Sequence, residues 1–292
     1  QNKIDKIPFD LLEDRINKSL SPEIFRFGLE NLERLTEDIS VWKSRFSDKV
    51  AEIFLYEDKR DFLEEKLKNA PYKYLLGILL SNNGEYIVDK ILKFRDGVDP
   101  DHPTVKICRE VENTLKNREG ETFNLGDVLE FLRRPPYGLY PNMANYAVLS
   151  FALRPFIGKL YELGTGRKLT KELLKEKVSS VFKYWTNGKD REKLEVRLGT
   201  SEERELTDIL ADLFDIKESE SLNSTRWRIR EWVKQIGLPV WSLKELAQNN
   251  KGILLAIGAI DYIIKTLDRD LLEDKIRSIL DILKYTKIDL KL

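Results

Sequence analysis

The apolar positions of residues 8–118 recur at the three- and four-residue spacing of amphipathic helices. A first helix is expected to start at Ser21-Pro22 and to carry an apolar face from Phe25 to Leu35. Further helices are predicted at 41–56, 58–68, 72–80 and 86–94. We therefore expect this half of the chain to be an all-helical bundle.

The stretch RRPPYGLYPNMANYAVLSFALRPF at 133–156 places a Pro-Pro-Tyr-Gly turn before an unusually apolar segment. The prolines end the preceding helix because they fix φ and remove two donors, and Gly138 is free to adopt a positive φ. Pro141 and Asn142 suit the start of a second helix. Residues 143–156 then carry almost no charge, so we expect this helix to be buried.

Beyond residue 120, short extended runs appear among the helices. The elements expected here are a helix at 124–133, the apolar helix at 143–156, a β-hairpin formed by 159–163 and 167–170 around Gly-Thr-Gly, a helix capped by Thr170 that ends before Asn187-Gly188, a strand at 192–199, and a helix from Ser201 to Phe214. This order resembles a winged-helix module with an extension.

A polar segment at 217–225 separates this module from a last helical part. That part should contain a helix at 226–236, a capping box of Ser242 with Glu245, and helices at 252–267 and 270–284. The predicted fold class is mainly α, a helical bundle with a central winged-helix-like module that contains a small β-hairpin. Three domains are predicted: an N-terminal helical domain at 1–120, the winged-helix-like module at 121–216, and a C-terminal helical region at 217–292.

Charge and composition limit the classes of function. The 50 basic and 50 acidic residues cancel, which weakens any claim of strong non-specific nucleic-acid binding. Abundant Lys and Glu, with one Cys and one Met, are typical of a heat-adapted protein. Cys108 has no partner for an intrachain disulfide, and the longest apolar run, 253–264, is shorter than the roughly 20 residues of a membrane span. We expect a cytoplasmic protein with no membrane contact.

The beginning of the chain shows neither an initiator Met nor a signal pattern, which fits a processed product or a fragment of a longer protein.

Residues that would support a reaction are scarce. The Gly-Thr-Gly-Arg-Lys-Leu-Thr run at 164–170 has the wrong spacing for a phosphate-binding loop, so a hairpin turn is favoured and no cofactor is predicted. His102 is the only histidine and sits in a Pro-rich turn, where a surface or capping role is expected. Carboxylate pairs such as Glu64-Glu65 are expected to be solvated. No catalytic, cofactor-binding or metal-binding residue is therefore predicted.

Two basic groups are candidates for nucleic-acid contact. The first is the wing, with Lys159, Arg167 and Lys168 backed by Lys171 and Lys175. The second is a stripe of Arg226, Arg230 and Lys234, which alternates with tryptophan in RWRIREWVK.

A less specific interpretation of the stripe is favoured over nucleic-acid binding. On a helix, Ile229, Trp232, Val233 and Ile236 would form the core side, and the basic stripe would be solvated. Trp227 and Trp241 are expected to pack against neighbouring helices. The helix before the hairpin uses its side chains for a core, so docking is also favoured over base reading.

Three segments resemble a known family. They are RRPPYGLYPNMANYAVLSFALR, GKLYELGTGRKLT and RWRIREWVKQIGLPVWSLKEL. Together, over about residues 120–246, they resemble the region downstream of the ATPase core in large prokaryotic P-loop ATPases of phage-defence systems of the bacteriophage-exclusion type. The resemblance implies a helical and winged-helix-like appendage. ATPase activity is not implied for this chain, because it lacks the nucleotide-binding motifs.

These observations predict a non-catalytic interaction region of a DNA-associated ATPase machine. Its expected partners are an ATPase core or other protein subunits, with DNA contacted weakly. The alternative is a free-standing winged-helix protein that binds nucleic acid through the basic wing and stripe. A third hypothesis is an unrecognised enzyme, which would need a deep pocket with convergent carboxylates.

Overall fold

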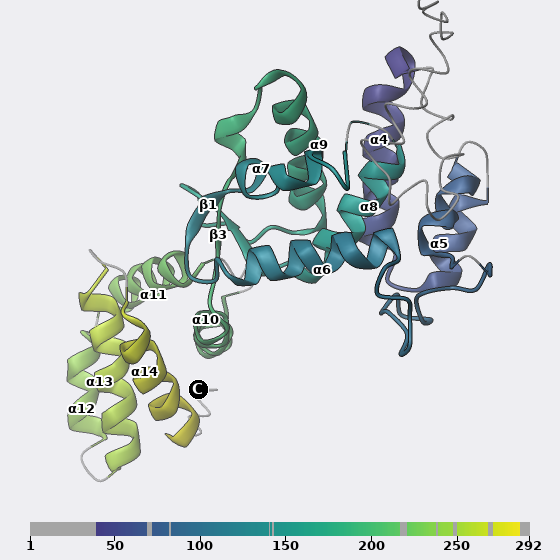
Figure 1. The fold of residues 1–292 in the computed structure, drawn as a ribbon. Coiled ribbons are helices and arrows are strands. Elements are labelled where there is room, and N and C mark those ends of the chain that lie inside the picture. Colours follow the sequence, from purple (N-terminus) through teal and green to yellow (C-terminus); the bar gives the residue numbers. More distant parts are fainter. Residues whose placement is uncertain are drawn as a thin grey trace, which may run out of the picture. The chain divides into compact units, whose positions relative to one another are not determined.

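The computed structural model describes residues 39–68, 72–81, 83–139, 141, 143–216, 221–237, 239–247, 250–267 and 271–286. Figure 1 shows that this part of the chain is mainly helical, as predicted, with one small sheet. The helix expected between Phe25 and Leu35 lies outside the described residues, as does Asn142. The side chain of Trp42 is likewise not described.

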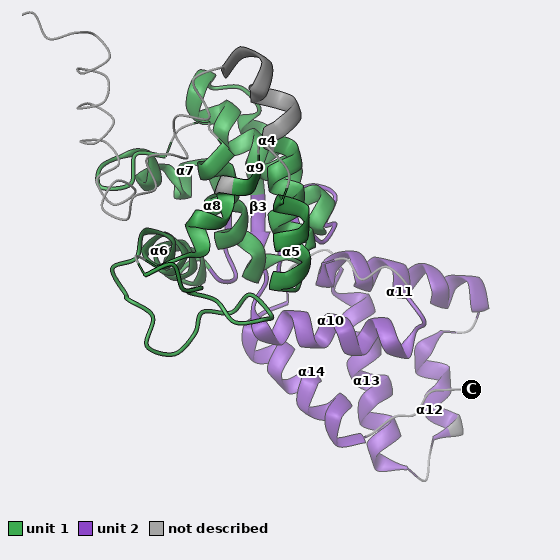
Figure 2. Cartoon of the chain, turned by 90° about the vertical axis from the view of Figure 1, so that its right-hand side faces the viewer, with its two compact units in different colours: residues 1–118, 123–157, 170–195 green, residues 119–122, 158–169, 196–292 purple. Residues whose placement is uncertain are grey.

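The chain forms two compact units, which Figure 2 distinguishes by colour. Unit 1 is made of the described residues within 1–118, 123–157 and 170–195. Unit 2 is made of those within 119–122, 158–169 and 196–292. The three predicted domains stay a prediction.

Unit 1 is built from helices. They are α4 (Ile39–Tyr56), α5 (Arg60–Leu67), η1 (Tyr72–Leu79), α6 (Pro103–Lys116), α7 (Leu125–Val128), η2 (Glu130–Arg133), α8 (Met143–Leu153), η3 (Arg154–Phe156), α9 (Lys171–Asn187) and η4 (Arg191–Leu194). The helices predicted at 41–56, 58–68 and 124–133 are confirmed, and the one predicted at 72–80 takes the tighter 3₁₀ form.

Helix α8 is the centre of unit 1. All of its residues are buried, and it packs against α4 and α6. This confirms that the uncharged segment after the Pro-Pro-Tyr-Gly turn is a core helix, since a helix that is apolar all round has no solvent face. Gly138 in the turn has φ +59°, the positive value expected for it.

The predicted helix at 86–94 is wrong. This segment forms tight turns, with one isolated β-bridge between Val88 and Phe94 and another between Tyr86 and Leu80. The carboxylate of Asp89 accepts hydrogen bonds from the backbone N–H groups of Ile91 and Lys93, both at 2.9 Å. Such local side-chain bonds offer the backbone an alternative to the helical ladder, and Leu92 completes the turn with φ +61°.

Unit 2 contains helices α10 (Ser201–Leu213), α11 (Leu222–Ile236), η5 (Val240–Ser242), α12 (Leu243–Leu246), α13 (Lys251–Lys265) and α14 (Glu273–Thr286). Its main core joins α10, α11, α13 and α14. The buried side chains of this core include Leu206, Leu210, Ile229, Ile263 and Ile279. The helices predicted from 201, 226, 252 and 270 are thereby confirmed, with shifts of up to a few residues at their ends.

The strands are β1 (Thr122–Asn124), β2 (Leu160–Glu162) and β3 (Glu195–Leu198), arranged in one antiparallel sheet in the order β1-β3-β2. Strand β2 pairs with β3 so that Leu160 faces Leu198. The predicted strand at 192–199 is confirmed for its second half, whereas its first residues form η4.

The predicted hairpin around Gly-Thr-Gly is confirmed in part: 160–162 form strand β2, whereas the second run meets it through an isolated bridge between Tyr161 and Lys168. The N–H of Glu162 donates to the carbonyl of Arg167 (2.9 Å), and the N–H of Leu169 donates to the carbonyl of Leu160 (2.8 Å). Gly164 in the turn has φ +87°, which suits glycine.

Helix caps follow the sequence signals in part. Thr170 caps α9 as predicted, with its hydroxyl accepting from the N–H of Leu173. Helix α10 starts with a capping box in which Thr200 and Glu203 bond each other's backbone N–H groups. The capping box predicted at Ser242 is wrong, because that hydroxyl donates to the carbonyl of Pro239 (2.7 Å) instead.

Candidate functional site

His102 and Cys108, the first candidates for side-chain chemistry, are both buried. His102 caps α6: its Nδ1 accepts from the N–H of Thr104 (3.2 Å), and its Nε2 lies 3.0 Å from the carbonyl oxygen of Leu80. The capping role predicted for it is confirmed, and the surface role is wrong. Burial lowers the pKa of His102 and raises that of the Cys108 thiol, so each side chain is held neutral.

Within the described ranges, no three His, Cys, Asp or Glu side chains converge as a metal site would require.

The basic wing lies on the hairpin of unit 2. Lys159 and Arg167 are exposed, and Lys168 is half-buried. Arg167 pairs with Glu162 (3.2 Å), and Lys168 pairs with Asp208 (3.6 Å). A phosphate at this wing would therefore compete with carboxylates already in contact with the cations.

Lys171 and Lys175, which were expected to back the wing, belong to α9 in unit 1. The ammonium of Lys171 bonds the carboxylate of Asp58 (2.9 Å) and the carbonyl of Tyr56 (3.1 Å). Lys175 lies 3.7 Å from Glu52 and stacks over the Tyr56 ring. Both lysines thus tie α9 to the end of α4.

Arg226 does not belong to an exposed stripe, which corrects the sequence prediction. It is fully buried, and its guanidinium donates to the carbonyl of Ile263 and to both oxygens of Thr266 at the end of α13. It also donates to the side chain of Asn223 at 2.7 Å. Burying this cation is possible because the guanidinium meets several oxygen acceptors. Arg226 is therefore a structural residue.

The other two residues of the predicted stripe remain near the surface of α11. The Arg230 guanidinium stacks 5.3 Å from the centre of the Trp227 ring. Lys234 is exposed and donates to Glu231 at 2.6 Å. Neither residue is buried with Arg226.

Tryptophan exposure is the feature of this region that the sequence interpretation missed. Trp227, Trp232 and Trp241 are 49%, 45% and 54% exposed, although all three were expected to pack in the interior. Ile236, placed on the same core side, is 48% exposed. The true buried side of α11 runs through Leu222, Thr225, Arg226 and Ile229.

The sequence contains a spacing that fits the observed buried side, although it fits the predicted side as well. Leu222, Ile229 and Val233 are spaced seven and four residues apart, and a helix with that stripe inward carries Arg226 within it. Trp227 and Trp232 fall outside that stripe.

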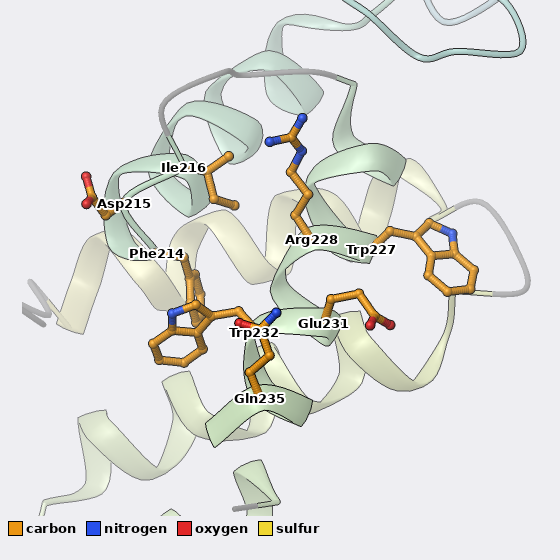
Figure 3. A pocket seen from close by; sticks show the side chains of 8 residues that line it. All are labelled: Phe214, Asp215, Ile216, Trp227, Arg228, Glu231, Trp232 and Gln235. Carbon is orange, nitrogen blue, oxygen red and sulfur yellow. The ribbon is translucent and has the colours of Figure 1, made fainter. Parts of the chain in front are cut away.

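A groove of about 520 Å³ lies between α11 and the segment that follows α10. It is lined by Phe214, Asp215, Ile216, Trp227, Arg228, Glu231, Trp232 and Gln235. Figure 3 shows Trp227 and Trp232 extending to opposite sides, with Arg228 and Glu231 between them. The edge of Phe214 meets the face of Trp232 at 5.2 Å and 80°, an arrangement that orients this half-exposed indole.

A second exposed apolar surface lies on α13. Its Ala256, Ala259 and Ile263 are buried, whereas Leu255 and Tyr262 are 46% and 36% exposed. Gly258 lies on the same face between Leu255 and Tyr262, because it follows Leu255 by three residues and precedes Tyr262 by four. A Cβ added at Gly258 would meet no atom within 4 Å. This helix thus packs in the core on one side and keeps an apolar side open. We refer to Leu255, Gly258 and Tyr262 as the α13 face.

No family model, curated protein or solved structure matches this chain. None of the helices in the described part of the chain combines the length and apolarity of a membrane span.

Proposed function

We propose that this chain is a non-catalytic interaction region of a DNA-associated ATPase machine in prokaryotic phage defence. The family resemblance of residues 120–246 indicates the type of machine, and we take the exposed α13 face as the surface that contacts it. Its partner is an ATPase core or an adjoining subunit. ATP binding and hydrolysis belong to that partner, since this sequence carries no phosphate-binding loop.

The α13 face is the observation that carries this proposal. A helix as apolar as ILLAIGAIDYII is normally covered on every side, yet Leu255 and Tyr262 face solvent here. Gly258 adds a notch between them, which lets the backbone of another element approach closely. Exposed apolar side chains on a helix that otherwise packs in a core suit a contact with another protein.

The winged-helix-like description is part of the same proposal. The order β1, α7, α8 and hairpin within the predicted module resembles part of a winged helix, although the central strand β3 follows only after α9. In a DNA-reading version α8 would enter the major groove. Because every residue of α8 is buried, the module is better suited to packing and docking.

Co-expression with a P-loop ATPase of the bacteriophage-exclusion type tests the proposal. We expect the two proteins to co-elute in gel filtration with light scattering. Leu255→Lys and Tyr262→Lys should abolish co-elution because each places a charge within the contact. Leu272→Lys is the matched control, since Leu272 is 69% exposed and lies outside α13. Elution of the wild-type chain as a free monomer would refute the proposal.

The alternative, a free-standing duplex-binding protein, is favoured by the exposure of Lys159 and Arg167 on the hairpin. It predicts sub-micromolar duplex affinity at about 150 mM salt, lost when Arg167, Lys168, Arg230 and Lys234 are reversed in charge. Under our proposal, duplex binding stays weak, because carboxylates that contact Arg167, Lys168 and Lys234 already offset their charge.

A further inference from the structure

The side chain of His102 joins the first turn of α6 to the end of η1. It is fully buried, its Nδ1 accepts from the N–H of Thr104 (3.2 Å), and its Nε2 lies 3.0 Å from the carbonyl oxygen of Leu80. Thr104 adds a second bond across the same contact, because its hydroxyl donates to the carbonyl of Ile78 (2.6 Å). We refer to His102 and Thr104 as the α6 latch.

These contacts fix the protonation state of the imidazole. Because Nδ1 accepts a hydrogen bond, it carries no proton, so the neutral ring holds its proton on Nε2 and donates it to the carbonyl of Leu80. A protonated imidazole has two N–H donors and no acceptor. Protonation therefore removes the bond from the Thr104 N–H and turns two N–H groups toward each other. It also places a positive charge at the N-terminus of α6, where the helix dipole opposes it.

A groove of about 380 Å³ adjoins the latch, and His102 is one of its lining residues. The charged residues that line this groove are three carboxylates and one cation, which give a net charge of −2: Glu85, Asp96, Asp99 and Arg95. Tyr86, the remaining titratable group of the lining, stays neutral because burial raises its pKa to about 12. The groove therefore suits a charged imidazole, whereas the buried position suits a neutral one.

The other charged groups near the latch do not alter this balance. Lys106, one turn further along α6, pairs with Asp101 (3.3 Å). The residues of the η1 end, Ile78 to Leu80, carry no charge. Asp99 attracts a proton to His102, but burial outweighs this attraction and lowers the pKa of the imidazole.

The turn that precedes the latch is weakly held by apolar contacts. Residues 96–101 are exposed, apart from half-buried Val98. Within the turn, the carboxylate of Asp99 accepts from the N–H of Asp101 (2.9 Å), and the carbonyl of Asp99 accepts from the N–H of His102 (3.1 Å). Moving this turn away from η1 therefore exposes little apolar surface beyond the latch itself.

We propose that the α6 latch is an acid-sensitive contact: protonation of His102 releases residues 96–104 from the end of η1, and the charged imidazole moves into the acidic groove. The released form binds the proton more tightly than the closed form does. Release is therefore favoured as the pH falls below about 6.5, the ordinary pKa of an imidazole, and the latch is closed above it. This inference concerns unit 1 and does not rest on the proposed function.

Amide hydrogen exchange followed by NMR on the full chain tests this inference, with each rate divided by the intrinsic rate at the same pH. Between about pH 7.5 and 5.5, protection of the Thr104 amide should fall about tenfold, because each pH unit below about 6.5 allows at most a tenfold gain in release. The Leu173 amide is the internal control. It is bonded by the hydroxyl of Thr170 at the start of α9 in the same unit, and this hydroxyl does not titrate.

A variant and a second signal complete the experiment. His102→Asn keeps a capping acceptor that does not titrate, so protection of Thr104 should no longer depend on pH. If this variant does not fold, the comparison of Thr104 with Leu173 in the wild type decides the question. His102 is the only histidine, so its ¹⁵N imidazole signals are unambiguous and should place the proton on Nε2 at about pH 7.5.

Four results would overturn the inference. They are a loss of protection at Thr104 below about threefold, an equal loss at Leu173, an equal loss at Thr104 in His102→Asn, and a proton on Nδ1 at about pH 7.5. An equal loss at Leu173 would mean that acid loosens the whole unit rather than the latch.

Discussion

Replacing Arg226 with alanine removes the buried guanidinium that joins α11 to the end of α13. Its Nε donates to the carbonyl of Ile263 (3.2 Å), and its Nη2 donates to the carbonyl and the hydroxyl of Thr266. Carbonyls in the last turn of a helix have no partner within that helix. A cation at this position also opposes the negative end of the helix dipole. Arg226 therefore acts as a C-terminal cap supplied by another helix.

The size of the loss follows from the groups left behind. Arg226→Ala leaves the carbonyls of Ile263 and Thr266 without this donor, and each buried acceptor left unsatisfied costs about 1–3 kcal/mol. The cavity left by the side chain adds to this cost, while removal of a buried charge subtracts from it. With two acceptors left without this donor, we expect the free energy of unfolding of unit 2 to fall by about 2–5 kcal/mol. Arg226→Lys keeps the charge but has fewer donors, so we expect it to lower the free energy of unfolding by about 1–3 kcal/mol.

Urea unfolding followed by tryptophan fluorescence measures this loss, because Trp227, Trp232 and Trp241 all lie in unit 2. Arg228→Ala is the control: Arg228 is an exposed arginine on the same helix and should change stability by less than about 0.5 kcal/mol. A loss below about 1 kcal/mol for Arg226→Ala, or equal losses for both variants, would refute the reasoning.

Three further predictions concern stability. Phe151→Ala should destabilise unit 1 by about 3–5 kcal/mol in urea unfolding, because Phe151 is 5% exposed within α8 and packs edge-on against Phe94; a loss under about 1 kcal/mol would place α8 at the surface. Since burial lowers the pKa of His102, the unfolded chain binds that proton more tightly, so stability should fall as pH drops through about 6.5. His102→Asn, which retains a capping acceptor, should flatten this dependence in melts between about pH 5 and 7, and an unchanged slope would assign it to other groups. Gly258→Ala should raise the thermal stability of the isolated chain by about 0.5–1 kcal/mol while weakening co-elution with the ATPase, and unaltered co-elution would show that the notch is not used.

Local chemistry was enough to predict much of the fold. Thr170 caps α9 through its own hydroxyl, and Gly164 turns the hairpin through its own backbone freedom, so these signals need no distant partner. The burial of α8 also follows from composition, because residues 143–153 carry no charge to place in water. The family resemblance and the three domains stay predictions.

Tertiary structure decided what several local patterns left open. At 86–94 the apolar spacing fits a helix, but turn bonds to Asp89 satisfy the backbone instead. Along α11, apolar and basic residues occupy more than one side, so the helical period alone did not settle which side faces inward. Packing against α13 brings the carbonyls of Ile263 and Thr266 to Arg226, and that contact turns Trp227 and Trp232 outward. The outward position of the α11 indoles therefore depends on contact with α13, more than thirty residues away in the sequence, and no local pattern specifies that contact.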